Sequence, residues 1–198
     1  MSTGTIILIV VIAVVVLLLL IVMGSYNGLV KLNERVEEAW SDITVQLKRR
    51  ADLIPNLVET VKGYTKHENE AIKMVSEARA KMMGARSVSQ TAEADKSFMG
   101  ALSRIMAVSE SYPELKADAN FRQLTEELTD TEDKVQAARR FYNAGVKEFN
   151  TKTKVFPTVL INNMFLHFKQ REYYEVDEEE AKRIDKAPTV SFDDKKEK

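Results

Sequence analysis

The chain has 198 residues and a formal net charge of −1, with 29 basic and 30 acidic side chains. This balance argues against a polyanionic partner, so we expect no nucleic acid binding. The sequence has no cysteine, which excludes disulfides, thiolate metal sites and a cysteine nucleophile. Charged residues make up 30% of the chain but are nearly absent from its first 30 positions, so we expect two parts with different solvents.

The first element is an uninterrupted apolar run from Ile6 to Met23. An α-helix rises about 1.5 Å per residue, so about 20 residues cross the hydrocarbon core of a bilayer. The alternative is a cleaved signal peptide, but the run exceeds the usual apolar region of such peptides and no basic residue precedes it. We therefore expect a short N-terminal tail over 1–5 and a transmembrane helix over 6–24.

The side of the membrane is indicated by the basic residues next to this run. Lys31 and Arg35 follow it closely, and the tail before it has no basic side chain. The positive-inside rule therefore favours a single-pass protein of the inner (cytoplasmic) membrane whose remaining residues lie on the cytoplasmic side.

A second element is expected over residues 26–50, where Leu29, Val36 and Ile43 recur at a seven-residue spacing typical of a helix. The same register continues through Arg50 and Leu57, as it would in a single kinked helix.

Two residues argue against that continuous helix. Arg50 would lie on the apolar line, and Pro55 would remove the backbone hydrogen bond to Ala51. We therefore expect a turn near residue 52 and a separate helix over 55–83, with one kinked helix as the alternative.

The remaining long helices have clear boundary signals. Ser87 and Gln90 form a capping-box pattern, Pro113 ends the helix that follows, and Asp118 can cap another. That last helix carries an apolar seam: Phe121, Leu124, Leu128, Val135, Ala138, Tyr142 and Phe149. We expect an all-α protein in which an N-terminal transmembrane helix is followed by an antiparallel four-helix up-and-down bundle over residues 25–168.

An up-down-up-down layout returns the chain to the membrane at residues 155–168, VFPTVLINNMFLHF. This apolar stretch either packs on the base of the bundle or lies in the lipid interface. Residues 169–198 are highly charged and predict a mobile tail, within which PTVSF could add an edge strand to a partner.

Catalytic chemistry finds little support in the sequence. A di-iron bundle needs Glu-x-x-His motifs, but the residues three before His67 and His167 are Tyr64 and Met164. Glu68 lies on the apolar line of its helix, either as a proton-linked group or metal ligand, or as a bundle-end carboxylate that pairs with a basic residue. We expect no catalytic, cofactor-binding or metal-binding residues and no enzymatic activity.

Interaction surfaces are better supported. The expected turn combines a basic cluster with apolar residues far from lipid, and the 155–168 stretch adds an aromatic residue. The predicted surface consists of Arg49, Arg50, Leu53, Ile54 and Phe165.

Several blocks of sequence together resemble the LemA family. They include RRADLIPNLV, SYPELKADANF, RRFYNAGVKEFNTKTKVFP and APTVSF, in order between about residues 26 and 192 and behind one transmembrane helix. The resemblance implies a bacterial-type, membrane-anchored four-helix bundle without established enzymatic chemistry. It also implies a scaffold or adaptor in envelope maintenance that associates with itself or with a membrane zinc protease of the HtpX type. A lipid-interface or membrane-remodelling protein that uses residues 155–168 is the alternative, and an enzyme with an unrecognised site is a third hypothesis.

Overall fold

The computed structural model describes residues 2–65 and 69–174, and these contain helices and no strand. The elements in chain order are α1 (Thr3–Tyr64), α2 (Asn69–Gly84), α3 (Val88–Ser111), α4 (Pro113–Ala117), α5 (Ala119–Lys152), α6 (Thr158–Ile161) and the π-helix η1 (Asn162–Leu166). The protein is therefore all-α, as expected from the sequence.

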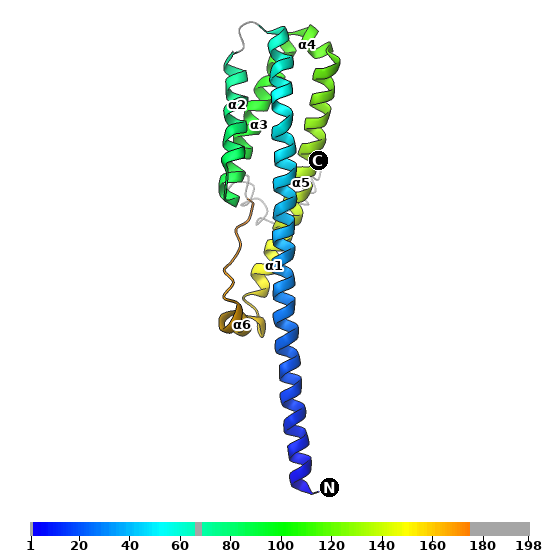
Figure 1. Ribbon diagram of the computed structural model, residues 1–198, viewed down its shortest axis with the longest axis vertical. Helices are drawn as coiled ribbons and strands as arrows, with labels where there is room; N and C mark the ends of the chain where they lie inside the picture. The colour runs from blue at the N-terminus through cyan, green and yellow to red at the C-terminus, as the bar shows by residue number, and fades with distance from the viewer. Residues whose placement is uncertain (1, 66–68, 175–198) are drawn as a thin grey trace, which may run out of the picture.

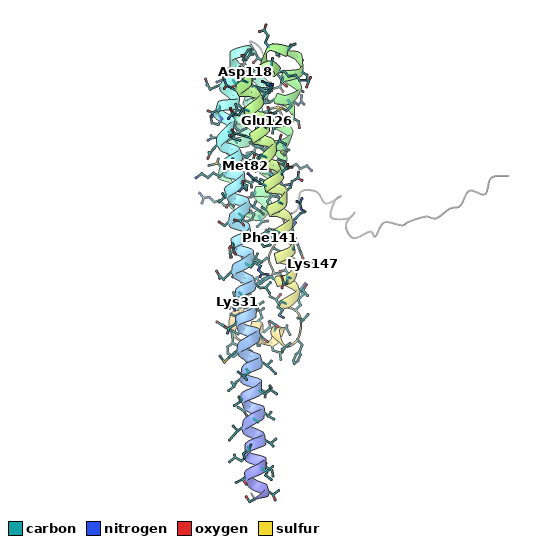
Figure 2. The ribbon with its side chains drawn as sticks, turned by 90° about the vertical axis from the view of Figure 1, so that its right-hand side faces the viewer. Lys31, Met82, Asp118, Glu126, Phe141 and Lys147 are labelled. Atoms are coloured by element: carbon teal, nitrogen blue, oxygen red, sulfur yellow. The ribbon has the colours of Figure 1, made fainter. Side chains whose placement is uncertain are left out.

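The four long helices run alternately up and down. Figure 1 shows α2, α3 and α5 around the upper part of α1, with α6 beside α1 at the base of this bundle. Figure 2 shows α5 descending beside α1, from Asp118 at the top to Lys147 near Lys31. An ion pair between Arg35 and Glu148, 3.9 Å apart, joins the two helices in this antiparallel register.

The expected turn near residue 52 is wrong, because α1 continues through Pro55 as one 62-residue helix. Pro55 has no N–H to offer to the carbonyl oxygen of Ala51. That oxygen instead accepts a 2.9 Å hydrogen bond from Nε of Arg79, on α2. The first reversal of the chain thus falls between Tyr64 and Asn69.

The core follows the seven-residue register predicted for α1. Its fully buried positions include Leu29, Val36, Ile43, Arg50 and Leu57. The seam of α5 also faces the core, with Phe121, Leu128, Val135, Tyr142 and Phe149 buried. Arg50 therefore occupies a core position, which the sequence analysis had treated as evidence against a continuous helix.

Two predicted helix caps are confirmed. The Ser87 hydroxyl accepts the backbone N–H of Gln90 at the start of α3, and the Asp118 carboxylate accepts that of Phe121 at the start of α5. The bond from Phe121 lowers the pKa of Asp118, and a second bond from the Tyr64 hydroxyl adds to this effect. The Tyr64–Asp118 bond also ties the upper end of α1 to the start of α5.

Below the bundle, α1 extends alone (Figure 1). Its apolar residues from Ile6 to Met23 are exposed, and this one stretch among the described residues is long and apolar enough to cross a membrane. Exposed aliphatic side chains on this scale are unfavourable in water, so this stretch has the length and composition of a membrane span.

The boundary predicted for the C-terminal tail needs a correction. Residues 169–174 do not form a free tail, because Arg171 hydrogen-bonds to α5 and Tyr174 is buried against α3. We call residues 168–174 the strap. Figure 1 shows it rising from α6 and η1 towards the lower end of α2. The predicted PTVSF patch lies outside the described residues.

Candidate functional site

The centre of the bundle contains a buried cluster of charges built around Arg50. Its guanidinium pairs with Asp95 of α3 and Glu132 of α5, and both Arg50 and Asp95 have fully buried side chains. The same guanidinium lies 4.8 Å from the centroid of the Phe98 ring and 3.5 Å from the sulfur of Met99. Removal of a charge from water is costly unless a partner compensates it, and here each buried charge has one.

Asp95 joins this cluster to the strap. Its second carboxylate oxygen pairs with Arg139 of α5 and accepts a 2.9 Å hydrogen bond from the Tyr174 hydroxyl. The Arg139 guanidinium also lies 4.9 Å from the centroid of the Tyr174 ring. The phenol is protonated at neutral pH and can donate this bond, and burial raises the pKa of Tyr174 from its ordinary 10.0 to about 12, so the proton is retained further into the alkaline range. The two cations and two anions of the cluster balance in charge.

The strap is held along its backbone by three asparagine side chains. Asn162, Asn150 and Asn143 each donate to the carbonyl oxygen and accept from the N–H of a single strap residue, at distances between 2.8 and 3.1 Å. The residues held are Phe168, Arg171 and Tyr174, respectively. An asparagine amide offers a donor and an acceptor side by side, so it can bind both the backbone N–H and the carbonyl oxygen of a residue outside helices and sheets.

The side chains of these same three strap residues point into the bundle. The Phe168 ring lies 5.8 Å from that of Phe149. The Arg171 guanidinium donates to Asn33 at 2.7 Å and to Glu37 at 2.5 Å. Backbone and side chain of every third strap residue are thus both recognised. Asn33 of α1 thus serves as an acceptor for the strap.

A cleft of about 370 Å³ lies beside the strap. Its residues come from α1, the start of α3, α5 and the strap, and include Trp40, Tyr142, Arg86 and Glu172. The Trp40 and Tyr142 rings are 5.6 Å apart. The cleft therefore combines aromatic surface with charges of both signs, and the strap forms one of its walls.

The base of the bundle exposes apolar side chains, whereas the centre buries charged ones. The most exposed large apolar side chains around α6 and η1 are Phe156 (78%), Met164 (68%), Phe165 (59%) and Leu160 (52%). Helix α6 contacts α1, close to where the apolar stretch of α1 ends. This is the 155–168 segment that the sequence analysis placed either on the bundle or in the lipid interface.

The structure does not bring the predicted interaction residues together. Arg50 and Ile54 are buried, which removes them from any exposed surface, and Leu53 is partly buried. Arg49 and Phe165 are exposed, but they belong to different elements, Arg49 to α1 and Phe165 to η1. The 49–54 segment lies within a helix rather than at the expected turn.

The asparagines that hold the strap are residues of this site that were not predicted from the sequence. Asn143 and Asn150 each follow a seam residue of α5, Tyr142 and Phe149, at a seven-residue spacing. Polar residues repeated beside a core seam were the available signal. Their ligand could not be inferred, because the strap itself carries no regular pattern.

Among residues 2–65 and 69–174, no group of three or more His, Asp or Glu side chains is placed to hold a metal ion. His67 and Glu68, which the sequence analysis considered for metal or proton chemistry, lie outside the described residues.

A family model and a curated relative of this chain both point to one family. The model of the LemA family matches residues 39–192. Protein LemA of Metamycoplasma hominis is 29% identical over 141 residues, covering 69% of this chain and 63% of the relative. Magnetosome protein MamQ of Magnetospirillum gryphiswaldense is 24% identical over 175 residues, covering 75% of this chain and 64% of the relative. The chain thus spans a little under two thirds of the length of these curated relatives. Since the family model covers most of the chain, including the C-terminal part of α1 and the whole of α2 to α5, the protein belongs to the LemA family.

Proposed function

We propose that this protein is a non-enzymatic, membrane-anchored scaffold or adaptor, which acts in envelope maintenance by self-assembly. The observation that carries the proposal is the exposed apolar surface of α6 and η1 beside the point where α1 leaves its apolar stretch. With α1 as one unbroken helix, a second membrane contact at the base fixes the orientation of the bundle. Neighbouring copies then stand parallel and present their flanks to one another, where Val45 and Phe141 are exposed apolar residues.

The charges around this base support a lipid contact, the feature on which the alternative lipid-interface function also rests. Residues 151–169 contain Lys152, Lys154 and Lys169 but no acidic residue. Exposed apolar side chains bordered by lysines are typical of segments that lie in the interface of an anionic membrane. The segment therefore adds a hydrophobic and an electrostatic contribution to membrane binding.

The lipid contact can be tested with a tryptophan probe. In a Trp40→Phe background, which removes the single native tryptophan, Phe165→Trp is reconstituted into vesicles that contain brominated lipids. We expect quenching and a blue-shifted emission for this probe. A matched probe, Glu126→Trp at an exposed position high on α5, should show neither (Figure 2). Equal water exposure of both probes would contradict a membrane contact at the base.

Self-assembly is tested separately with two differently tagged copies produced together. We expect the copies to co-purify, and Phe141→Asp to reduce the yield. Arg49→Glu tests the part of the predicted surface that remains exposed, with Lys62→Glu as a matched charge reversal on the same helix. Failure of the unmodified copies to co-purify would reject self-assembly, and an unaffected Arg49→Glu protein would reject that surface.

Two parts of the proposal rest on the sequence alone. Lys31 and Arg35 support a bundle on the cytoplasmic side of the inner membrane. The family resemblance supports a membrane protease of the HtpX type as a partner. Protease accessibility of the bundle in intact and opened spheroplasts tests the orientation, and affinity purification from the membrane tests the partner.

A further inference from the structure

We propose that the groove that holds the strap is a binding site for an extended peptide, and that residues 168–174 of a second copy occupy it in trans. This inference deepens the proposed self-assembly and rests on it. The groove is defined by the three asparagines Asn143, Asn150 and Asn162 together with the side-chain sites for Phe168, Arg171 and Tyr174.

The mode of recognition is that of a peptide site rather than of a packed helix. The asparagines bind backbone groups at every third strap residue, so they select an extended chain without reading its sequence. Selectivity comes from the side chains of those same strap residues: an aromatic ring on Phe149, a guanidinium on Asn33 and Glu37, and a phenol on the buried Asp95. The groove thus fits an aromatic-x-x-Arg-x-x-Tyr segment.

The strap is separable from the bundle that it covers. Residues 167–174 belong to no helix, and the backbone N–H groups of Phe168, Arg171 and Tyr174 are bonded to asparagine side chains. Release of the strap therefore leaves the backbone hydrogen bonds of α1 to α5 intact. His167, just before the strap, adopts a left-handed conformation with φ 52°, at the point where the chain turns away from η1.

A second copy is the occupant that the structure favours. The one segment shown to match all three asparagines and all three side-chain sites is the strap itself, and exchange of an identical element is a low-cost route to an oligomer. Copies anchored in one membrane also meet at a raised effective concentration. The open cleft beside the strap, between Arg86 and Gln170, leaves the groove accessible along one side.

The experiment uses full-length chains and exploits the absence of native cysteine. One tagged copy carries Gln170→Cys on the strap, and a second, differently tagged copy carries Arg86→Cys, at a residue that lines the same cleft but lies outside the strap. The two are produced together, reconstituted in vesicles and treated with a short bis-maleimide. A chain with both substitutions provides the intrachain reference. We expect a covalent heterodimer between the two copies. The matched control replaces Arg86→Cys by Glu126→Cys, an exposed position high on α5, and should give none above background (Figure 2).

Variants of the groove and of the strap test the contacts themselves. Asn143→Leu with Asn150→Leu should abolish the 86–170 heterodimer, whereas Asn163→Leu, next to Asn162 but exposed, should not. Arg171→Ala changes only the strap, which is the bound segment, and should also reduce the yield of the heterodimer. This variant keeps the test valid if the double asparagine variant does not fold.

The outcomes separate this inference from the proposed function. If the tagged copies co-purify but only intrachain 86–170 products form, strap exchange is overturned while self-assembly stands. If the copies do not co-purify at all, both proposals fail. Equal heterodimer yields with Arg86→Cys and Glu126→Cys would mean random collision and would also overturn the exchange.

Discussion

The middle and the base of this bundle both reverse the usual distribution of side chains. In the middle, Arg50 and Asp95 are charged and fully buried. At the base, Phe156 and Met164 are apolar and largely exposed. Each reversal is stable only if its surroundings compensate for it. The protein supplies the compensation in the middle, through ion pairs from α3 and α5, whereas at the base the function proposed above assigns the compensation to the membrane.

This difference separates structural from functional residues. A buried charge network with every charge paired constrains which helices meet and in which register, and its effects should appear in folding. An exposed apolar surface contributes little to folding and has an interaction role instead. Substitutions in the middle should therefore lower the free energy of unfolding much more than substitutions at the base.

The largest effect is expected from Asp95→Asn in the middle of the bundle. This change leaves Arg50 and Arg139 without their shared buried carboxylate. Loss of one partner of a buried pair costs about 3–5 kcal/mol, because the remaining charge stays out of water without compensation. Urea unfolding in detergent, followed by circular dichroism and by Trp40 fluorescence, measures the loss.

A matched control for this prediction is Asp130→Asn on α5, where the carboxylate forms an exposed pair with Lys134. It should leave the unfolding midpoint unchanged. A similar loss in both variants would mean that the cluster has no special role in stability.

The second effect is a dependence of stability on pH that arises from Tyr174. Its pKa is raised to about 12 by burial, so the fold favours the protonated phenol. The unfolded chain loses this proton near pH 10 and the folded chain near pH 12. The stabilisation is therefore complete below pH 10 and declines as pH rises to 12, by about 2–3 kcal/mol for two pH units. Tyr174→Phe should remove this decline, and the difference between the two unfolding curves isolates it from other titrations.

Much of the fold could be predicted from the sequence because helix patterns are local. The seven-residue register placed Arg50 on the core line of α1, and the caps at Ser87 and Asp118 follow from residues three positions apart. The error at Pro55 had a non-local cause. Whether a proline interrupts a helix depends on what satisfies the freed carbonyl group, and here this is Arg79, 28 residues away.

The candidate site was less predictable for the same reason. The partners of Arg50 lie 45 and 82 residues away in sequence. No local pattern therefore predicts that Arg50 is buried together with carboxylates that balance its charge. Likewise, Asn143 and Tyr174 are 31 residues apart and meet only because α6 and η1 reverse the chain below the bundle. The sequence indicated that polar residues border the seams, but only the tertiary structure shows what they bind.

The third prediction concerns the compensation at Pro55. Arg79→Met keeps the apolar stem of the side chain but removes the hydrogen bond to the Ala51 oxygen, at a cost of about 1 kcal/mol. Pro55→Ala restores a backbone N–H to that oxygen and should raise the free energy of unfolding by no more than about 3 kcal/mol. In the double variant, the cost of Arg79→Met should nearly vanish. Additive effects in this cycle would contradict the role assigned to Arg79.

The smallest effect on folding is expected at the base, from Met164→Asn combined with Leu160→Asn. Both side chains are exposed, so the free energy of unfolding should change by no more than about 0.5 kcal/mol. The same two changes should reduce the quenching of the Phe165→Trp probe by brominated lipids, because they remove apolar surface from the membrane contact. A loss of stability close to that of Asp95→Asn would mean that the base is part of the core after all. Unchanged stability together with unchanged quenching would mean that its exposed apolar residues face neither the protein nor the bilayer, and the distinction between the two regions would fail.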